Sequence, residues 1–83
     1  MEELKKVIEE NISDADCGIY FTRNLVGDPM TTVYKNGNIQ VDICYGYAYF
    51  EIFGLSENEQ EEIMEFYEVA RNKFWKEERR IFA

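Results

Sequence analysis

Apolar residues recur at helical spacing near both ends of the chain. In the first segment, charged residues separate Leu4, Val7, Ile8 and Ile12, which predicts an amphipathic helix of about three turns. Further along, Ser56-x-x-Glu59 is a capping box, which predicts a long helix from Glu57 to about Arg80. The apolar stripe of this long helix contains Ile63, Phe66, Tyr67, Ala70, Phe74 and Ile81. We expect Trp75 and Met64, beside that stripe, to meet the first helix or a partner.

Between the helices the pattern is typical of β-strands. We expect four strands: Ile19–Asn24, Met30–Lys35, Ile39–Cys44, and a last one that ends at Gly54. Asn36-Gly37 favours a type I′ hairpin between the second and third strands, because both turn positions need positive φ. The sequence therefore predicts an α+β fold in a single domain, residues 1–83, with an antiparallel meander between two helices that cover one sheet face.

The alternation along the third strand predicts its pairing with the fourth. A two-residue turn at Tyr45–Gly46 sets Ile43 opposite Ala48 and Val41 opposite Phe50, all on the face toward the helices. With Gly46 in this turn, a side chain at that position should be strained by about 1 kcal/mol. The outer face then pairs Cys44 with Tyr47, Asp42 with Tyr49, and Gln40 with Glu51. We expect this outer face to be acidic and aromatic.

Negative charge is concentrated in one part of the chain. The formal net charge is -8, and seven Asp/Glu with no Lys/Arg lie between Glu51 and Glu68. Through Ala70 there are fifteen acidic and four basic residues, whereas Arg71–Ala83 has five basic and two acidic ones. Such a field repels nucleic acid and anionic membrane and attracts basic protein surfaces. Half of such acidic helix faces are simply solvated, and the helix dipole favours this gradient.

Few residues suit catalysis or metal binding. There is no histidine, so triads that use a His base cannot form, and the two cysteines, Cys17 and Cys44, form no CxxC motif. Asp14 and Asp16 do not have the spacing of a calcium loop. A carboxylate pair on the outer sheet face, Asp42 and Glu51, leaves an enzyme as a minor hypothesis. We expect no catalysis, no cofactor and no metal.

The candidate partner-binding residues are acidic and aromatic. Tyrosine is enriched at interface hot spots, and the outer face should present Tyr47 and Tyr49 close to the acidic run. Carboxylates on the outer stripe of the long helix recur about 6 Å apart, once per turn, and resemble a row of phosphates. The candidate set is Asp42, Tyr47, Tyr49, Glu51, Glu57, Glu61, Glu65 and Glu68.

The segment at residues 41–56, VDICYGYAYFEIFGLS, gives the chain a familiar character. With its small size and acidity, the chain resembles small proteins of phages and prophages of Gram-positive bacteria, among which anti-CRISPR proteins are found. In physical type it is also similar to the uracil-DNA glycosylase inhibitor and to acidic immunity proteins that neutralise nuclease toxins. The resemblance implies an inhibitor that occupies a nucleic-acid-binding surface, with Cas9 as the first candidate target.

These observations leave alternatives open. The leading hypothesis is a protein-binding inhibitor and DNA mimic that acts in the cytoplasm of a bacterial host, as a monomer or a homodimer. It has a basic nucleic-acid-binding protein as its partner and makes no direct contact with nucleic acid or membrane. The alternatives are a nuclease-toxin immunity protein, or a small-molecule-binding phage protein that oligomerises through Trp75, Phe82 and the exposed sheet.

Overall fold

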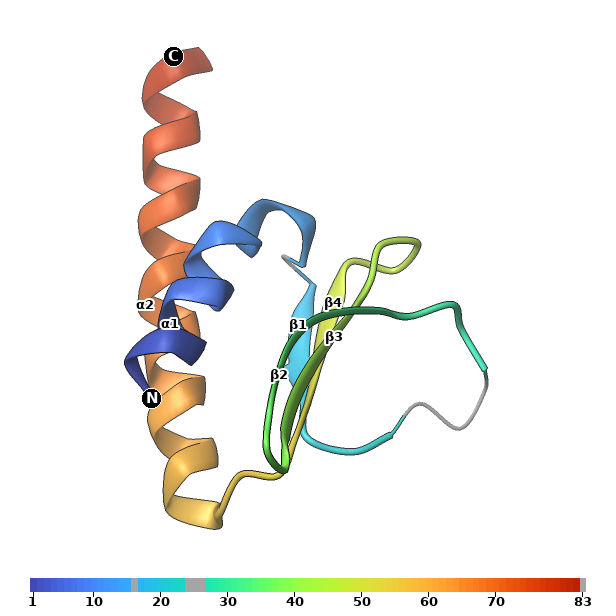
Figure 1. Ribbon diagram of the computed structural model, residues 1–83. Helices are drawn as coiled ribbons and strands as arrows, with labels where there is room; N and C mark the ends of the chain where they lie inside the picture. Colours follow the sequence, from blue (N-terminus) through green and yellow to red (C-terminus); the bar gives the residue numbers. More distant parts are fainter. Residues whose placement is uncertain (16, 24–26, 83) are drawn as a thin grey trace.

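The structure, a computed structural model, describes residues 1–15, 17–23 and 27–82, with side chains as far as Glu77. The elements follow one another in the order α1 (Glu2–Glu10), the short 3-10 helix η1 (Ile12–Asp14), β1 (Gly18–Tyr20), β2 (Thr31–Asn36), β3 (Ile39–Cys44), β4 (Tyr49–Phe53) and α2 (Glu57–Phe82). The protein is thus an α+β fold with a helix on either side of the strands in sequence (Figure 1).

Both predicted helices are present. Leu4 and Ile8 of α1 are buried, as the helical spacing requires, but α1 ends at Glu10 and Ile12 enters the core from η1. In α2, Ile63 and Tyr67 are buried, and the partly buried side chains of the same stripe pack against the core. The side chain of Ile81 lies outside the described residues. No helix in the described part of the chain is long and apolar enough to cross a bilayer.

The sheet is mixed, with the strand order β1-β4-β3-β2. Strand β1 runs parallel to β4, with Gly18 opposite Tyr49, whereas β4, β3 and β2 are antiparallel neighbours. The predicted antiparallel meander is therefore wrong for β1, which lies at the edge far from β2. Periodicity identifies a strand and its buried face but not its neighbour. The backbone N–H of Cys17, just before β1, donates to the carbonyl of Ala48 at 2.8 Å and holds this edge in place.

Strand bounds also differ from the prediction. Strand β1 is shorter than Ile19–Asn24, and Asn24 itself lies outside the described residues. Asn36 still belongs to β2, opposite Ile39, so the turn is Gly37–Asn38. Gly37 has a φ of 61° but Asn38 does not have positive φ, so the turn is not the type I′ turn that we expected.

The β3–β4 register is shifted by two residues from the prediction. Ile43 lies opposite Phe50 and Val41 opposite Ile52, and a four-residue loop, Tyr45–Ala48, replaces the two-residue turn. A shift of two preserves the alternation, so the same residues face the core as predicted. The strained position of this loop is Ala48, with a φ of 58°, whereas Gly46 does not have positive φ.

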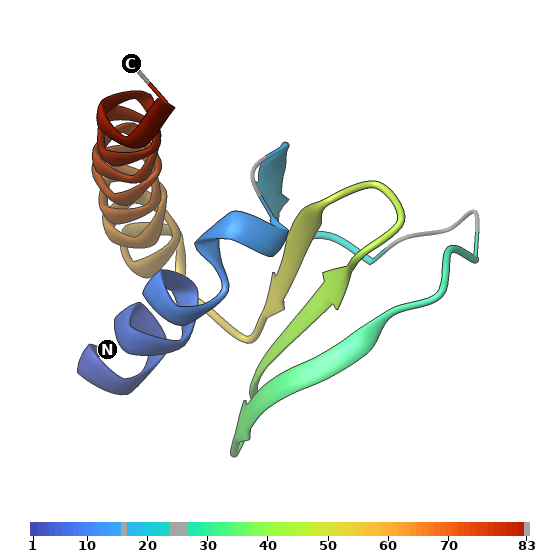
Figure 2. The same ribbon diagram turned by 90° about the horizontal axis from the view of Figure 1, so that it is seen from above.

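One core cluster joins the helices to the sheet. It contains Leu4 and Ile8 of α1, Ile63 and Tyr67 of α2, and the inward residues of the strands, among them Phe50. The rings of Phe50 and Tyr67 meet edge to face with their centroids 6.1 Å apart, a favourable aromatic geometry. The Tyr67 hydroxyl donates to the Ala15 carbonyl at 2.9 Å in the buried interior. Figure 2 shows α1 crossing between α2 and the strands.

The glycines at the two ends of the sheet give a first prediction. Gly54 has a φ of 87°, and a Cβ there would overlap the backbone carbonyl of Asn38, whereas a Cβ on Gly46 would meet nothing within 4 Å. We therefore expect Gly54→Ala to destabilise the fold by more than about 2 kcal/mol, because both strain and overlap oppose the methyl group. Gly46→Ala, the matched control, should change stability by less than about 0.5 kcal/mol in denaturant unfolding. Equal stabilities of the two variants would contradict the placement of Gly54 against the β2–β3 turn.

Candidate functional site

The outer stripe of α2 is the acidic face of the protein, defined here by Glu57, Glu61, Glu65 and Glu68. All four side chains are exposed, while Ile63 and Tyr67 on the opposite side of the helix are buried. This agrees with the helical spacing, since residues three and four apart share one face. The carboxylates therefore form a row of about one per 6 Å along the helix axis.

The capping box fixes where this row begins. The backbone N–H of Ser56 donates to Glu59 Oε1 at 2.9 Å, and the Glu59 N–H donates to the Ser56 hydroxyl at 3.3 Å. The hydrogen bond from the Ser56 backbone lowers the pKa of the Glu59 carboxyl below its usual range, and the Ser56 side chain adds to the shift. Helix α2 begins at Glu57 as predicted. These two contacts therefore set the residue at which the helix starts and, with it, where the acidic face begins.

The acidic face lacks a countercharge in the part of the chain that the structure describes. Among the residues that the structure describes, none of its four carboxylates has an ion-pair partner. Glu57 and Glu61, like Glu61 and Glu65, are four residues apart, and such like-charge pairs destabilise a helix by about 0.2–0.5 kcal/mol each. A basic surface placed against this face would remove that repulsion.

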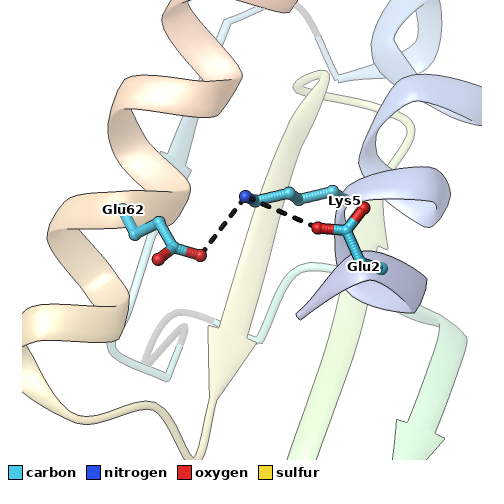
Figure 3. Close-up of polar contacts among 3 residues, drawn as sticks. All are labelled: Glu2, Lys5 and Glu62. Atoms are coloured by element: carbon cyan, nitrogen blue, oxygen red, sulfur yellow. Dashed lines mark ion pairs between the residues drawn. The ribbon is translucent and has the colours of Figure 1, made fainter.

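Lys5 neutralises a neighbouring carboxylate instead. Its Nζ lies 3.3 Å from Glu62 Oε2 and 4.0 Å from Glu2 Oε1, which joins α1 to α2 (Figure 3). The ammonium also lies 5.6 Å from the centroid of the Phe66 ring. Lys5 is mostly buried by these contacts, so it belongs to the contact between the helices and not to the acidic face.

Asp42 and Glu51 are not on an open surface, contrary to the prediction. They lie directly opposite each other on β3 and β4, on the face away from the core cluster, but only 9% and 3% of their surfaces are exposed. Asp42 Oδ1 accepts hydrogen bonds from the Thr32 hydroxyl at 2.7 Å and the Gln40 amide at 3.0 Å. Asp42 is therefore engaged in holding β2 to β3.

Two residues of the β1–β2 connection, Arg23 and Asp28, contact this second sheet face. Arg23 lies 5.2 Å from the centroid of the Phe53 ring, and the Tyr49 hydroxyl donates to Asp28 Oδ2 at 3.4 Å. In Figure 1 the described parts of the connection pass on the side of the strands away from α2. These contacts were not predicted, because nothing in the local sequence pattern relates Arg23 or Asp28 to the sheet face. Cys44, also on this face, is buried.

The two candidate tyrosines have different environments. Tyr47, in the β3–β4 loop, is 65% exposed. Tyr45 and Tyr20 are also exposed, each over more than half of its surface. Tyr49 is half-buried, with its ring edge-on to Tyr20 at 5.2 Å between centroids. Burial, followed by the charges of Glu51 and Asp28, raises the pKa of Tyr49 to about 12. Tyr49 is thus a packed side chain, and Tyr20 and Tyr45 are exposed tyrosines that the pattern did not single out.

The tyrosines and the acidic face do not meet. In Figure 1 the β3–β4 loop lies at the end of the strands away from the start of α2, and in both views it lies apart from that helix (Figures 1 and 2). We expected Tyr47 and Tyr49 to border the acidic run because they are close to it in sequence. Strand β4 separates them in space, since it runs from these tyrosines toward the start of α2. The candidate set therefore divides into the acidic face, the exposed β3–β4 loop with Tyr47, and a buried group of Asp42, Tyr49 and Glu51.

The far half of α2 carries an exposed indole side chain. Trp75 is 37% exposed and stacks edge to face on Phe74 at 5.9 Å, beside an open hollow lined by Arg71, Asn72 and Lys76. Met64, in contrast, packs partly buried against the core. The side chain of Phe82 lies outside the described residues.

No family model, curated protein or solved structure matches the chain.

The packing of Tyr49 leads to a titration experiment. Its pKa is raised to about 12, so the protonated form stabilises the fold. This contribution is complete below the ordinary tyrosine pKa of about 10 and is lost as the pH rises through the folded value. Tyrosinate absorbance should therefore show a late step near pH 12 in the native protein, which Tyr49→Phe reduces by one tyrosine and Tyr47→Phe leaves unchanged. Ionisation of all tyrosines together near pH 10 would contradict the packing of Tyr49.

The capping box gives a pH dependence at the acid end. Because the folded pKa of Glu59 is lowered, its carboxylate stabilises the fold above the ordinary pKa of about 4.3, and this is lost as the pH falls through the folded value. Glu59→Gln keeps the capping geometry without the titration. Its melting temperature should therefore fall less than that of the native protein between about pH 7 and about pH 3. Glu61→Gln, outside the cap, is the control and should behave like the native protein.

Proposed function

We propose that the protein is a small inhibitor that binds another protein, and that its acidic face occupies a basic nucleic-acid-binding surface of that partner. The observation that carries the proposal is the row of exposed carboxylates on α2 without countercharge among the described residues. A nucleic-acid groove lined with Lys and Arg is complementary to such a row in sign and in periodic spacing. The proposal assigns no catalytic role to the chain.

The rigid setting of α2 supports this function. Residues of both helices and of the central strands share one core cluster, and both ribbons lie on one side of the sheet in Figures 1 and 2. We therefore also propose that the two helices cover the same sheet face. In that arrangement α2 turns its buried stripe to the sheet and its carboxylates outward. A preorganised row of charges loses little conformational entropy on binding.

The target follows from the resemblance of the chain to small phage and prophage proteins. On this proposal the partner is a nuclease of the host defence, with a Cas9-type enzyme as the first candidate, and the site of action is the bacterial cytoplasm. Asp42, Tyr49 and Glu51 then serve the fold, because they are packed within it. Tyr47 lies apart from the acidic face and is a candidate for a separate contact.

Order-of-addition experiments test the competition. Added to a Cas9-type nuclease before target DNA, the protein should prevent DNA binding, and added afterwards it should inhibit much less. The reason is that both ligands would need the same basic surface. Equal inhibition in either order, or a stable complex of nuclease, DNA and inhibitor, would overturn the proposed mimicry of nucleic acid.

Charge reversal tests the role of the acidic face. Glu57→Lys, Glu61→Lys and Glu65→Lys together should slow association with the nuclease at least about tenfold and flatten its salt dependence, because exposed charges act mainly on the association rate. Tyr47→Ala serves as a surface control that leaves the charge unchanged. It should leave the association rate unchanged, because an uncharged side chain acts mainly on the dissociation rate.

A further inference from the structure

Helix α2 carries two halves of opposite charge. From Glu57 to Glu68 it has six acidic and no basic residues, whereas Arg71–Ala83 has five basic and two acidic ones. Among the side chains that the structure describes, those of α2 that pack against the core extend as far as Phe74. In Figure 1 the later turns of α2 extend beyond α1 and the sheet. The last turns of the basic half therefore extend away from the rest of the fold.

Exposed apolar side chains lie on this helix where the charge changes sign. Val69 is 68% exposed and Trp75 is 37% exposed, and the hollow beside Trp75 is lined by Arg71, Asn72 and Lys76. At about 100° per residue, Trp75 has the same direction as Glu57, and Glu68 differs by only about 20°. One face of α2 thus presents the carboxylates of the acidic face and, further along the helix, the indole of Trp75 between Arg71 and Lys76.

We propose that this face binds a second copy of the chain, with the two α2 helices packed side by side and antiparallel. In that arrangement the acidic half of each helix lies against the basic half of the other, and each Trp75 side chain becomes covered by the partner copy. A parallel pair would instead set acid against acid. Because the same patch serves on both copies, the contact is two-fold and closes as a dimer.

A second copy is the occupant that the charges favour. The chain itself supplies both complementary halves, and the carboxylates of the acidic face and the cations Arg71 and Lys76 beside Trp75 have no ion-pair partner among the described residues. The helix spans 26 residues, about 39 Å, so several opposite charges can meet at once. Networks of such pairs contribute more than isolated surface pairs do.

This inference goes beyond the proposed function and limits it. The dimer would cover the acidic face that the inhibitor uses, so self-association and partner binding exclude each other. The monomer is then the binding form. The dimer experiments use the protein alone, so their failure would leave the competition with nucleic acid untouched.

Sedimentation velocity and fluorescence measure the dimer directly. The native protein should be a dimer in dilute salt and dissociate at about 1 M NaCl, where the screening length falls to about 3 Å. The chain has a single Trp, so its emission reports on Trp75 alone. That emission should shift to shorter wavelength as dimer forms and return in high salt. A protein that stays monomeric at every concentration in dilute salt would overturn the proposal.

Charge complementation tests the antiparallel arrangement. One variant reverses the acidic half (Glu57, Glu61 and Glu65→Lys) and the other reverses the cations beside Trp75 (Arg71 and Lys76→Glu). Each alone should be monomeric, because like charges would face each other. An equimolar mixture should form a heterodimer, identified by its mass in native mass spectrometry. Circular dichroism shows whether each variant is folded before mixing.

The control variant changes the net charge without touching α2. Glu9, Glu10 and Asp14→Lys reverses exposed residues of α1 and η1 and alters the net charge as much as the acidic-half variant does. It should remain a dimer with the native salt dependence. A native dimer that persists in both single-half variants, or folded variants whose mixture stays monomeric, would show that another surface or another orientation is used.

Discussion

The side chain of Tyr67 is the contact on which the arrangement of the other elements depends. From the middle of α2 its ring meets Phe50 of β4, and its hydroxyl binds the carbonyl of Ala15 just ahead of β1. One buried residue thereby connects the last helix, the central sheet and the segment that leads into the edge strand. A helix with Tyr67 turned inward must turn Glu65 and Glu68 away from the core, since their directions differ from that of Tyr67 by about 160° and about 100°. The direction of the acidic face is thus a consequence of core packing.

Local patterns predicted what is decided locally. The start of α2 at Glu57 depends on Ser56 and Glu59, a few residues apart, and the sequence identified it. The inward residues of β3 and β4 were also predicted, because an error of two in register preserves the alternation. The neighbour of β1 was not, since the choice between two sheet edges depends on contacts distant in sequence. The burial of Glu51 escaped prediction for the same reason.

The candidate site follows the same division. Exposure of the carboxylates on α2 could be predicted from helical spacing alone, whereas the separation of Tyr47 from them could not, because it depends on how the chain returns through the sheet. The charge gradient of α2 also has two explanations that agree. Acids near the start of a helix and cations near its end are favoured by the helix dipole, and the same order makes two antiparallel copies complementary. A gradient retained for helix stability thus provides a self-binding surface without additional residues.

The parallel pairing of β1 with β4 has a consequence for the order in which the chain assembles. Gly18 and Tyr49 are about 30 residues apart, so their pairing closes a long loop and must await the strand at its far end. The β2–β3 and β3–β4 hairpins involve shorter separations and can form earlier. During synthesis on a ribosome, β1 therefore emerges first among the strands and remains without its neighbour until β4 has left the exit tunnel. The first strand to be made is the last that can be placed.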